Sequence, residues 1–162
     1  MLVDGRPNGT ASSEERNDDG GTFISFSAEL GNPRPTRALV GEVFLDRDLA
    51  WRPFQVEVDG RVRAIAHEDG VELEIEGVPA LQGVTVRRLV AGGLVPGGKR
   101  EVAVLRIGLD EPARRLKVRY TWLGGSRFRY EVPADHEASW LLVRPQTGVV
   151  VSLEDLAELS AP

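Results

Sequence analysis

The feature that most constrains the fold of this chain is a series of short segments in which apolar and polar residues alternate. The series starts at Phe23, and Gly, Pro and Asp residues separate its members. Alternation with a period of two puts apolar side chains on one face of a β-strand. The predicted strands cover residues 23–28, 38–45, 54–58, 62–67, 71–76, 84–90, 101–108, 116–122, 128–132, 139–143 and 149–151. Such a series predicts an all-β fold, an antiparallel β-sandwich or partly closed β-barrel of about 9–11 short strands.

Helical patterns are scarce by comparison. The sequence predicts one short helix at the C-terminal end, where Ser152 can cap a turn and Leu153, Leu156 and Leu159 recur at three-residue spacing. We find no helical segment of useful length between the strands, which argues against a parallel sheet with crossover helices.

The chain therefore divides into three predicted parts. Residues 1–22, which are polar and rich in glycine, are expected to form a disordered acidic N-terminal arm. Residues 23–151 form the all-β domain, and residues 152–162 form the short C-terminal helix and tail. Exposed sheet edges make a homodimer a possible assembly of such a domain.

Two hairpins can be registered from the sequence. A three-residue loop at Gly124–Ser126 pairs Trp122 with Phe128 and Tyr120 with Tyr130, which puts these aromatic side chains on the core side. It also sets Arg119 across from Glu131 on the outer side.

A similar three-residue loop at Asp59–Arg61 would pair Val58 with Val62, Val56 with Ala64 and Glu57 with Arg63. In both hairpins the charged pairs are expected to fix the register more than to serve a function.

Composition excludes several classes of protein. The 162 residues include no cysteine, which rules out disulfide scaffolds, thiolate metal sites and cysteine nucleophiles. The formal net charge of −5 argues against a non-specific nucleic-acid binder. No apolar run reaches membrane-spanning length, and no signal-peptide pattern follows Met1. We therefore expect a cytoplasmic protein without nucleic-acid or membrane partners.

Charge is distributed unevenly along the strands. Residues 23–86 hold 11 acidic and 6 basic side chains, and residues 87–151 hold 6 acidic and 12 basic ones. In the strand at 71–76, Glu72, Glu74 and Glu76 alternate with apolar residues, so we expect the apolar face of this strand to be buried and the glutamate face to be exposed to solvent. The acidic charges of residues 23–86 and the basic charges of residues 87–151 can attract each other within the fold, or one of these two charged surfaces can face a partner.

The partner hypothesis rests on the hairpin at 116–132. Its outer face presents four basic residues to an acidic protein segment or a phosphate-bearing ligand: Lys117, Arg119, Arg127 and Arg129. Leu153, Leu156 and Leu159 of the C-terminal helix would add an apolar docking strip. The sequence therefore predicts a non-catalytic protein-interaction or accessory module, whose protein partner it does not identify.

The sequence contains few residues or patterns that indicate catalysis. The chain has two histidines, and the cluster Asp135, His136 and Glu137 carries metal-capable side chains, but three consecutive loop residues rarely point at one ion. Nucleophile-elbow and phosphate-loop patterns are missing, so we predict no catalytic residues, no metal and no cofactor.

The aromatic residues carry the alternative function. Tyr120, Trp122, Tyr130 and Trp140 could line the apolar cavity of a small-molecule-binding β-barrel, a carrier or a cyclase-like enzyme, instead of filling its core. The two hypotheses differ in whether the interior holds a cavity. A ligand site needs one of about 300 Å³ or more, whereas a filled core leaves none.

Overall fold

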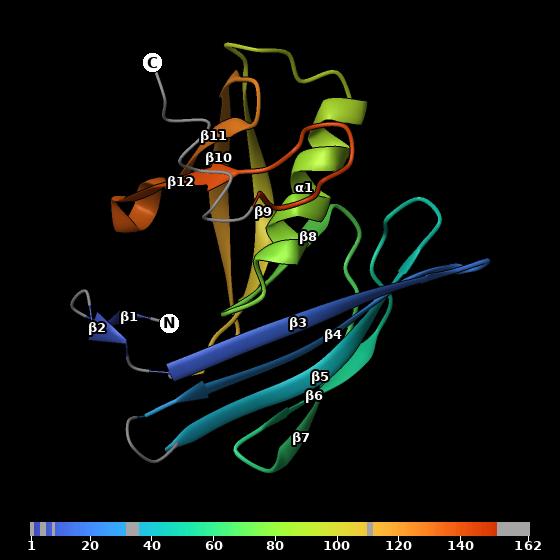
Figure 1. Cartoon of the computed structure of the whole chain (residues 1–162), viewed down its shortest axis with the longest axis vertical. Helices are drawn as coiled ribbons and strands as arrows, with labels where there is room; N and C mark the ends of the chain where they lie inside the picture. The colour runs from blue at the N-terminus through green and yellow to red at the C-terminus, as the bar shows by residue number, and fades with distance from the viewer. Residues whose placement is uncertain (1, 4–5, 8, 32–35, 110–111, 152–162) are drawn as a thin grey trace.

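Two five-stranded sheets dominate the architecture of the protein (Figure 1). The computed structural model describes residues 2–3, 6–7, 9–31, 36–109 and 112–151. The sheets stay open and pack through apolar side chains, which confirms the all-β, sandwich-like fold predicted from the alternating pattern and not the barrel alternative.

The first sheet is antiparallel throughout and follows the chain order. Its strands are β3 (Gly9–Asp18), β4 (Gly21–Leu30), β5 (Arg37–Asp46), β6 (Phe54–Val58) and β7 (Arg61–Ile65). A small separate hairpin, β1 (Leu2–Val3) and β2 (Arg6–Pro7), precedes it.

The second sheet has the order β12-β11-β10-β9-β8 and is mixed, because β8 runs parallel to β9. Its strands are β8 (Val71–Ile75), β9 (Lys99–Ile107), β10 (Arg114–Gly124), β11 (Arg127–Val132) and β12 (Glu137–Leu142). The helix α1 (Pro79–Ala91) connects β8 to β9, and a 3₁₀ turn, η1 (Pro133–Asp135), connects β11 to β12. In Figure 1, α1 lies across one face of this sheet and the first sheet crosses below both.

Two buried clusters join these layers. One lies between the first sheet and β8, β9 and the start of α1, and its members include Ile24, Val43, Leu73, Leu81 and Ile107. The other lies between α1 and the second sheet, and its members include Val86, Val104, Val118, Tyr120 and Phe128. Among the described residues, no helix is long and apolar enough to cross a membrane. The cytoplasmic location stays a prediction.

The predicted disorder of residues 1–22 is wrong for most of the segment. Residues 9–18 form β3, which pairs with β4 over its whole length. Nearly all side chains of β3 are exposed, so the strand buries little apolar surface and shows no core-facing alternation. Its backbone hydrogen bonds to β4 hold it in the sheet, and a side-chain pattern cannot reveal these.

The helix α1 also contradicts the sequence analysis, which placed a strand at 84–90 and no helix between strands. The β-branched residues of this segment favour strands by propensity. However, Pro79 occupies the first turn of the helix, where its missing N–H costs nothing, and Leu81, Thr85 and Val86 are buried on one side. The resulting β8–α1–β9 unit explains the parallel strand pair.

The two predicted hairpin registers have different outcomes. The pairs Trp122–Phe128, Tyr120–Tyr130 and Arg119–Glu131 are confirmed.

The hairpin of β6 and β7 is shifted by one residue, with Val58 opposite Arg61 and Val56 opposite Arg63. Asp59 and Gly60 both have positive φ angles, 52° and 75°, so they form the two-residue turn that hairpins favour. The shift leaves Val62 63% exposed on an edge strand.

Candidate functional site

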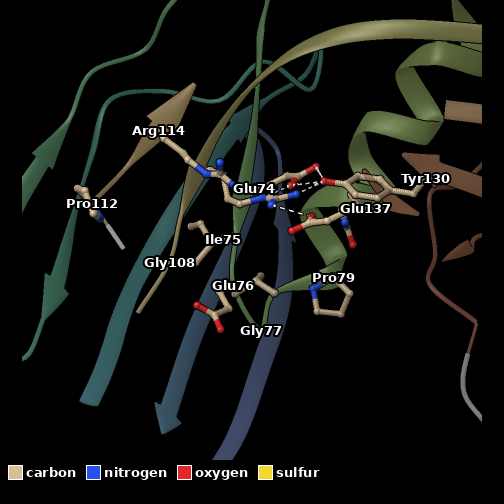
Figure 2. A pocket seen from close by; sticks show the side chains of 13 residues that line it. Glu74, Ile75, Glu76, Gly77, Pro79, Gly108, Pro112, Arg114, Tyr130 and Glu137 are labelled. Atoms are coloured by element: carbon tan, nitrogen blue, oxygen red, sulfur yellow. Dashed lines mark hydrogen bonds and ion pairs between the residues drawn. The ribbon is translucent and has the colours of Figure 1, made fainter. Parts of the chain in front are cut away.

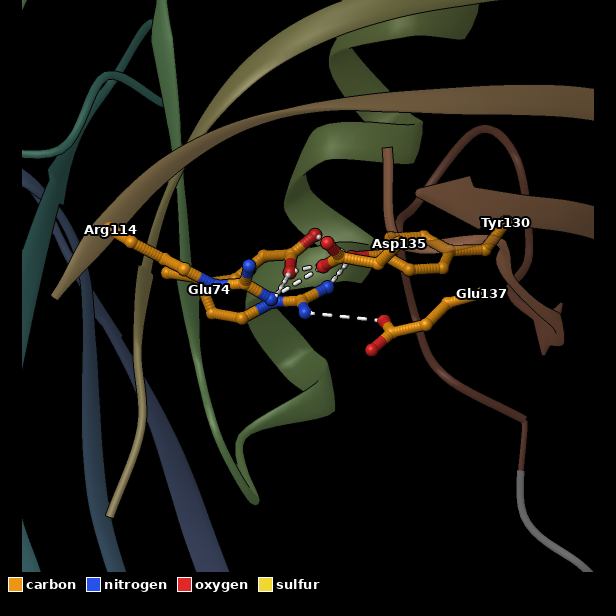
Figure 3. A network of polar contacts seen from close by, with 6 residues as sticks. Glu74, Arg114, Tyr130, Asp135 and Glu137 are labelled. Carbon is orange, nitrogen blue, oxygen red and sulfur yellow. Dashed lines mark hydrogen bonds and ion pairs between the residues drawn. The ribbon is translucent and has the colours of Figure 1, made fainter. Parts of the chain in front are cut away.

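A network of charged side chains lies on the face of the second sheet that also carries α1 (Figure 3). Glu74 of β8 and Arg106 of β9 are partners in the parallel register, so their side chains leave the sheet next to each other. The Nε of Arg106 donates to Glu74 at 3.2 Å, and its Nη1 donates to Glu137 of β12 at 3.3 Å.

Tyr130 of β11 completes this network. Its hydroxyl lies 2.7 Å from each carboxylate oxygen of Glu74 and donates to that carboxylate. The Nη2 of Arg106 donates in turn to the Tyr130 oxygen at 2.6 Å. The three side chains therefore form a closed triad, in which each group contacts the other two.

Burial sets the electrostatics of the triad. Glu74 is only 5% exposed, and this burial raises the pKa of its carboxyl, although the hydrogen bond from Tyr130 and the charge of Arg106 oppose the rise. Burial and the neighbouring Glu74 also raise the pKa of Tyr130. Burial tends to lower the pKa of Arg106, but contact with Tyr130 and Glu74 outweighs it and raises this pKa. At neutral pH the tyrosine is thus neutral and the arginine charged.

A second arginine extends the network toward the chain segment that follows β11. Arg114 faces Arg106 in the register of β10 and β9, and its Nη2 donates to Asp135 at 2.6 Å. This hydrogen bond lowers the pKa of Asp135. Each arginine is therefore held by at least one carboxylate.

These side chains open onto a pocket with a volume of about 500 Å³, shown in Figure 2. Its walls come from the end of β8, the first turns of α1, the end of β9 and the facing side chains of β10–β12. Its charged lining consists of Glu74, Glu76, Glu137, Arg106 and Arg114, so carboxylates outnumber guanidinium groups. The volume exceeds the minimum for a small-molecule site, and the lining also includes the apolar residues Ile75, Val78 and Pro79.

The prediction that the three glutamates of the strand at 71–76 face solvent is therefore wrong for two of them. Glu74 is buried in the triad, and the side chain of Glu72 is only 16% exposed, because Arg88 and Thr85 of α1 bind it. Glu76 stays exposed but accepts the N–H of Leu109 at 2.8 Å. The cause is α1, which covers the face that would otherwise meet water.

The four predicted basic residues lie on the opposite face of the same sheet. Lys117, Arg127 and Arg129 are exposed, and Arg119 is half-buried. Arg119 donates to Glu101 at 2.6 Å, and Arg129 pairs with Glu131 at 3.3 Å. The four residues thus share one face of the sheet, which is not the face of the pocket, but Lys117 and Arg127 lie toward opposite ends of the β10–β11 hairpin. Leu153, Leu156 and Leu159 lie outside the described residues.

The four aromatic residues of the alternative hypothesis do not line one cavity. Tyr120 and Trp122 are buried in the cluster beneath α1, and of the four only Tyr130 borders the pocket. Trp140 is 64% exposed on the outer face, with the guanidinium group of Arg127 5.7 Å from its ring centre.

Asp135 closes the 3₁₀ turn η1, and Glu137 opens β12. Asp135 and Glu137 bind the two arginines, and His136 adopts a left-handed conformation between them. Within the described ranges no three His, Asp or Glu side chains gather as metal ligands.

Sequence reasoning missed Glu74, Arg106 and Arg114 as site residues. One signal was present, because Val102, Val104 and Arg106 share a face of β9, and an arginine in line with two core valines needs a buried anionic partner. The alternation of glutamates along β8 was a second signal. Because α1 covers the face that carries them, Glu74 becomes the buried anionic partner of Arg106.

Comparison with known proteins gives one informative result. No protein-family model matches the sequence, and neither does any curated protein. The structure is similar to the crystal structure of a DUF1089 family protein from Pseudomonas aeruginosa, determined at 1.80 Å resolution. The TM-score is 0.69, the sequence identity is 22%, and the match covers 94% of this chain and 93% of the other. At this identity the likeness establishes the shared fold alone.

Proposed function

We propose that this protein binds a small organic molecule that carries an ammonium group, in the pocket beside Glu74. The observation that carries the proposal is the buried carboxylate of Glu74, which forms part of the wall of a cavity of about 500 Å³. Burying a carboxylate is costly, and Glu74 keeps its place in a pocket wall even though Arg106 and Tyr130 already bind it, which favours a functional site over a purely structural ion pair.

The balance of charges in the wall favours a cation over an anion. Both arginines already donate to carboxylates, Arg106 to Glu74 and Glu137 and Arg114 to Asp135. An incoming carboxylate or phosphate would have to displace these contacts. An ammonium group instead would meet the additional acceptor oxygens of Glu76 and Glu137, and its apolar part would contact Ile75 and Pro79.

Three probes that share a phenylethyl group test this proposal: 2-phenylethylamine, 2-phenylethanol and 3-phenylpropionate. We expect the amine to shift the backbone amide signals of Gly77 and Gly108 in ¹H–¹⁵N NMR spectra, since both residues line the pocket. The alcohol should bind at least several-fold more weakly and the carboxylate not measurably. Preferred binding of 3-phenylpropionate, or no shifts with any probe, rejects the proposal.

A variant whose pocket is filled by a larger side chain tests whether the amine binds there. Gln82 lines the pocket from α1, so Gln82→Trp should remove amine binding by occupying the space. Ala91→Trp introduces the same side chain at an exposed position near the other end of the helix and should leave binding unchanged. If the amine binds equally to Gln82→Trp, its site lies elsewhere and the proposal is wrong.

A further inference from the structure

The outer face of the second sheet carries a basic surface that the pocket does not use. We define the outer basic face as the exposed side of β10–β12, formed by Arg115, Lys117, Arg119, Arg127, Arg129 and Trp140. Its acidic neighbours are Glu101 and Glu131, together with Glu68, so basic groups outnumber acidic ones here although the whole chain has a net charge of −5.

Trp140 is the unusual member of this surface. Its side chain is 64% exposed, whereas Trp51 and Trp122 are 1% and 8% exposed. It lies directly across from Arg129 in the register of β12 and β11, and Arg127 contacts the same ring. Exposed tryptophan beside arginine is the composition that is enriched at the energetic centres of protein interfaces.

We propose that the outer basic face binds an extended acidic segment of a partner protein, with Trp140 as the apolar anchor. The basic residues of β10 alternate at positions 115, 117 and 119, so their side chains leave the sheet about 6.6–6.8 Å apart. Alternate side chains of an extended peptide have the same spacing. Carboxylates at every second position of the partner can therefore meet successive basic groups.

Three of the five basic residues already show that the face accepts carboxylates. Arg115 binds Glu68, Arg119 binds Glu101 and Arg129 binds Glu131. Within the described part of the chain, Lys117 and Arg127 have no carboxylate partner, and they are the groups that a partner would engage first.

The same observations favour a short acidic peptide over a nucleic acid. A long polyanion extends beyond the basic face and meets the net negative charge of the rest of the protein, which repels it. A segment with three or four carboxylates fits within the face.

Fluorescein-labelled hexaglutamate with a C-terminal leucine is the first probe, measured by fluorescence anisotropy at low salt. Binding should quench or shift the tryptophan emission too, because Trp140 is the exposed tryptophan. The double variant Lys117→Ala/Arg127→Ala should bind about five- to tenfold more weakly, because it removes two exposed charged contacts, each of which contributes modestly. Trp140→Ala should weaken binding and remove the emission change.

A matched control removes the same charge elsewhere. Arg61 and Arg63 are exposed on β7 of the first sheet, so Arg61→Ala/Arg63→Ala should bind within twofold of the unchanged protein. Equal weakening by both double variants would show a general charge effect and would overturn the proposal. Tighter binding of a fluorescein-labelled dT10 oligonucleotide than of the peptide would overturn it too, in favour of a nucleic-acid surface, as would no binding of the peptide.

Discussion

Replacing Tyr130 by phenylalanine tests the physical account of the triad. The substitution removes one oxygen, which accepts from Arg106 at 2.6 Å and donates to Glu74 at 2.7 Å. Both partners are charged and Glu74 is almost fully buried, so loss of the hydroxyl leaves a buried carboxylate with one hydrogen bond fewer. A hydrogen bond to a charged group contributes about 1.5–3 kcal/mol, so we expect the free energy of unfolding to fall by about 2–3 kcal/mol.

For a chain of this size, the expected loss corresponds to a fall in the melting temperature of about 4–12 °C. Urea denaturation followed by tryptophan fluorescence measures the free energy directly, and an unchanged m-value would show that the unfolding reaction stays the same. The loss of the Tyr130 hydrogen bond should also raise the pKa of Glu74 further, because this bond favours the ionised carboxylate.

Tyr120 supplies a matched control. It faces Tyr130 across the strand pair with ring centres 5.4 Å apart, and it is fully buried as well. Its hydroxyl has no hydrogen-bond partner among the described residues. Tyr120→Phe should therefore leave stability unchanged or raise it slightly. If Tyr120→Phe and Tyr130→Phe cost the same, the hydroxyl of Tyr130 does not stabilise the triad and the reasoning fails.

Two further predictions concern packing and pH. In Gly83→Ala, the new Cβ would lie 2.1 Å from the carbonyl oxygen of Gly148, so we expect a loss of about 2 kcal/mol in chemical denaturation; the gain of about 1 kcal/mol that helix propensity alone predicts would contradict this. Because the folded-state pKa of Glu74 is raised, its contribution to stability is fully present below the ordinary glutamate pKa of about 4.3 and is lost as the pH rises through the folded value. The unfolding free energy of the unchanged protein minus that of Glu74→Gln should thus decrease as the pH rises above about 4.3, and an increasing difference would show that the pKa of Glu74 is lowered instead.

The alternating pattern predicts the fold class because burial of one strand face leaves a direct trace in the sequence. The hairpin of β10 and β11 shows this best, since large aromatic residues on both strands allow one consistent register. The hairpin of β6 and β7 lacks such a constraint, because the residues of β7 are exposed or half-buried and a shift by one residue costs little burial. There the turn chemistry of Asp59 and Gly60 decides the register.

The helix α1 and the strand β3 could not be predicted for related reasons. The segment at 84–90 has β-branched residues that suit a strand, and it becomes helical because the helix buries Leu81, Thr85 and Val86 against its surroundings. Tertiary packing outweighs the propensity here. In β3, backbone hydrogen bonds to β4 stabilise a strand with exposed side chains, and this leaves no apolar periodicity.

The candidate pocket escaped prediction because it depends on α1. Alternating glutamates on a strand normally indicate a solvent-exposed face, and the pattern of β8 predicts such a face. Once α1 covers that face, the same pattern places Glu72 and Glu74 in a partly enclosed space, where Arg88 and Arg106 must compensate them. The position of a helix between two strands thus converts a pattern typical of a solvent-exposed face into the wall of a pocket.

The two proposed sites use opposite faces of the same strands, so a ligand at one site does not occupy the other. Along β11, Arg129 points to the outer basic face and the next residue, Tyr130, points to the pocket, because successive side chains of a strand alternate. The sheet thereby separates an acid-rich pocket from a basic surface by the thickness of one backbone layer. A ligand cation in the pocket and an acidic peptide on the outer face would lie on opposite sides of this layer and could bind together. Their charges attract across it, so each should strengthen the binding of the other slightly, by an amount that salt reduces.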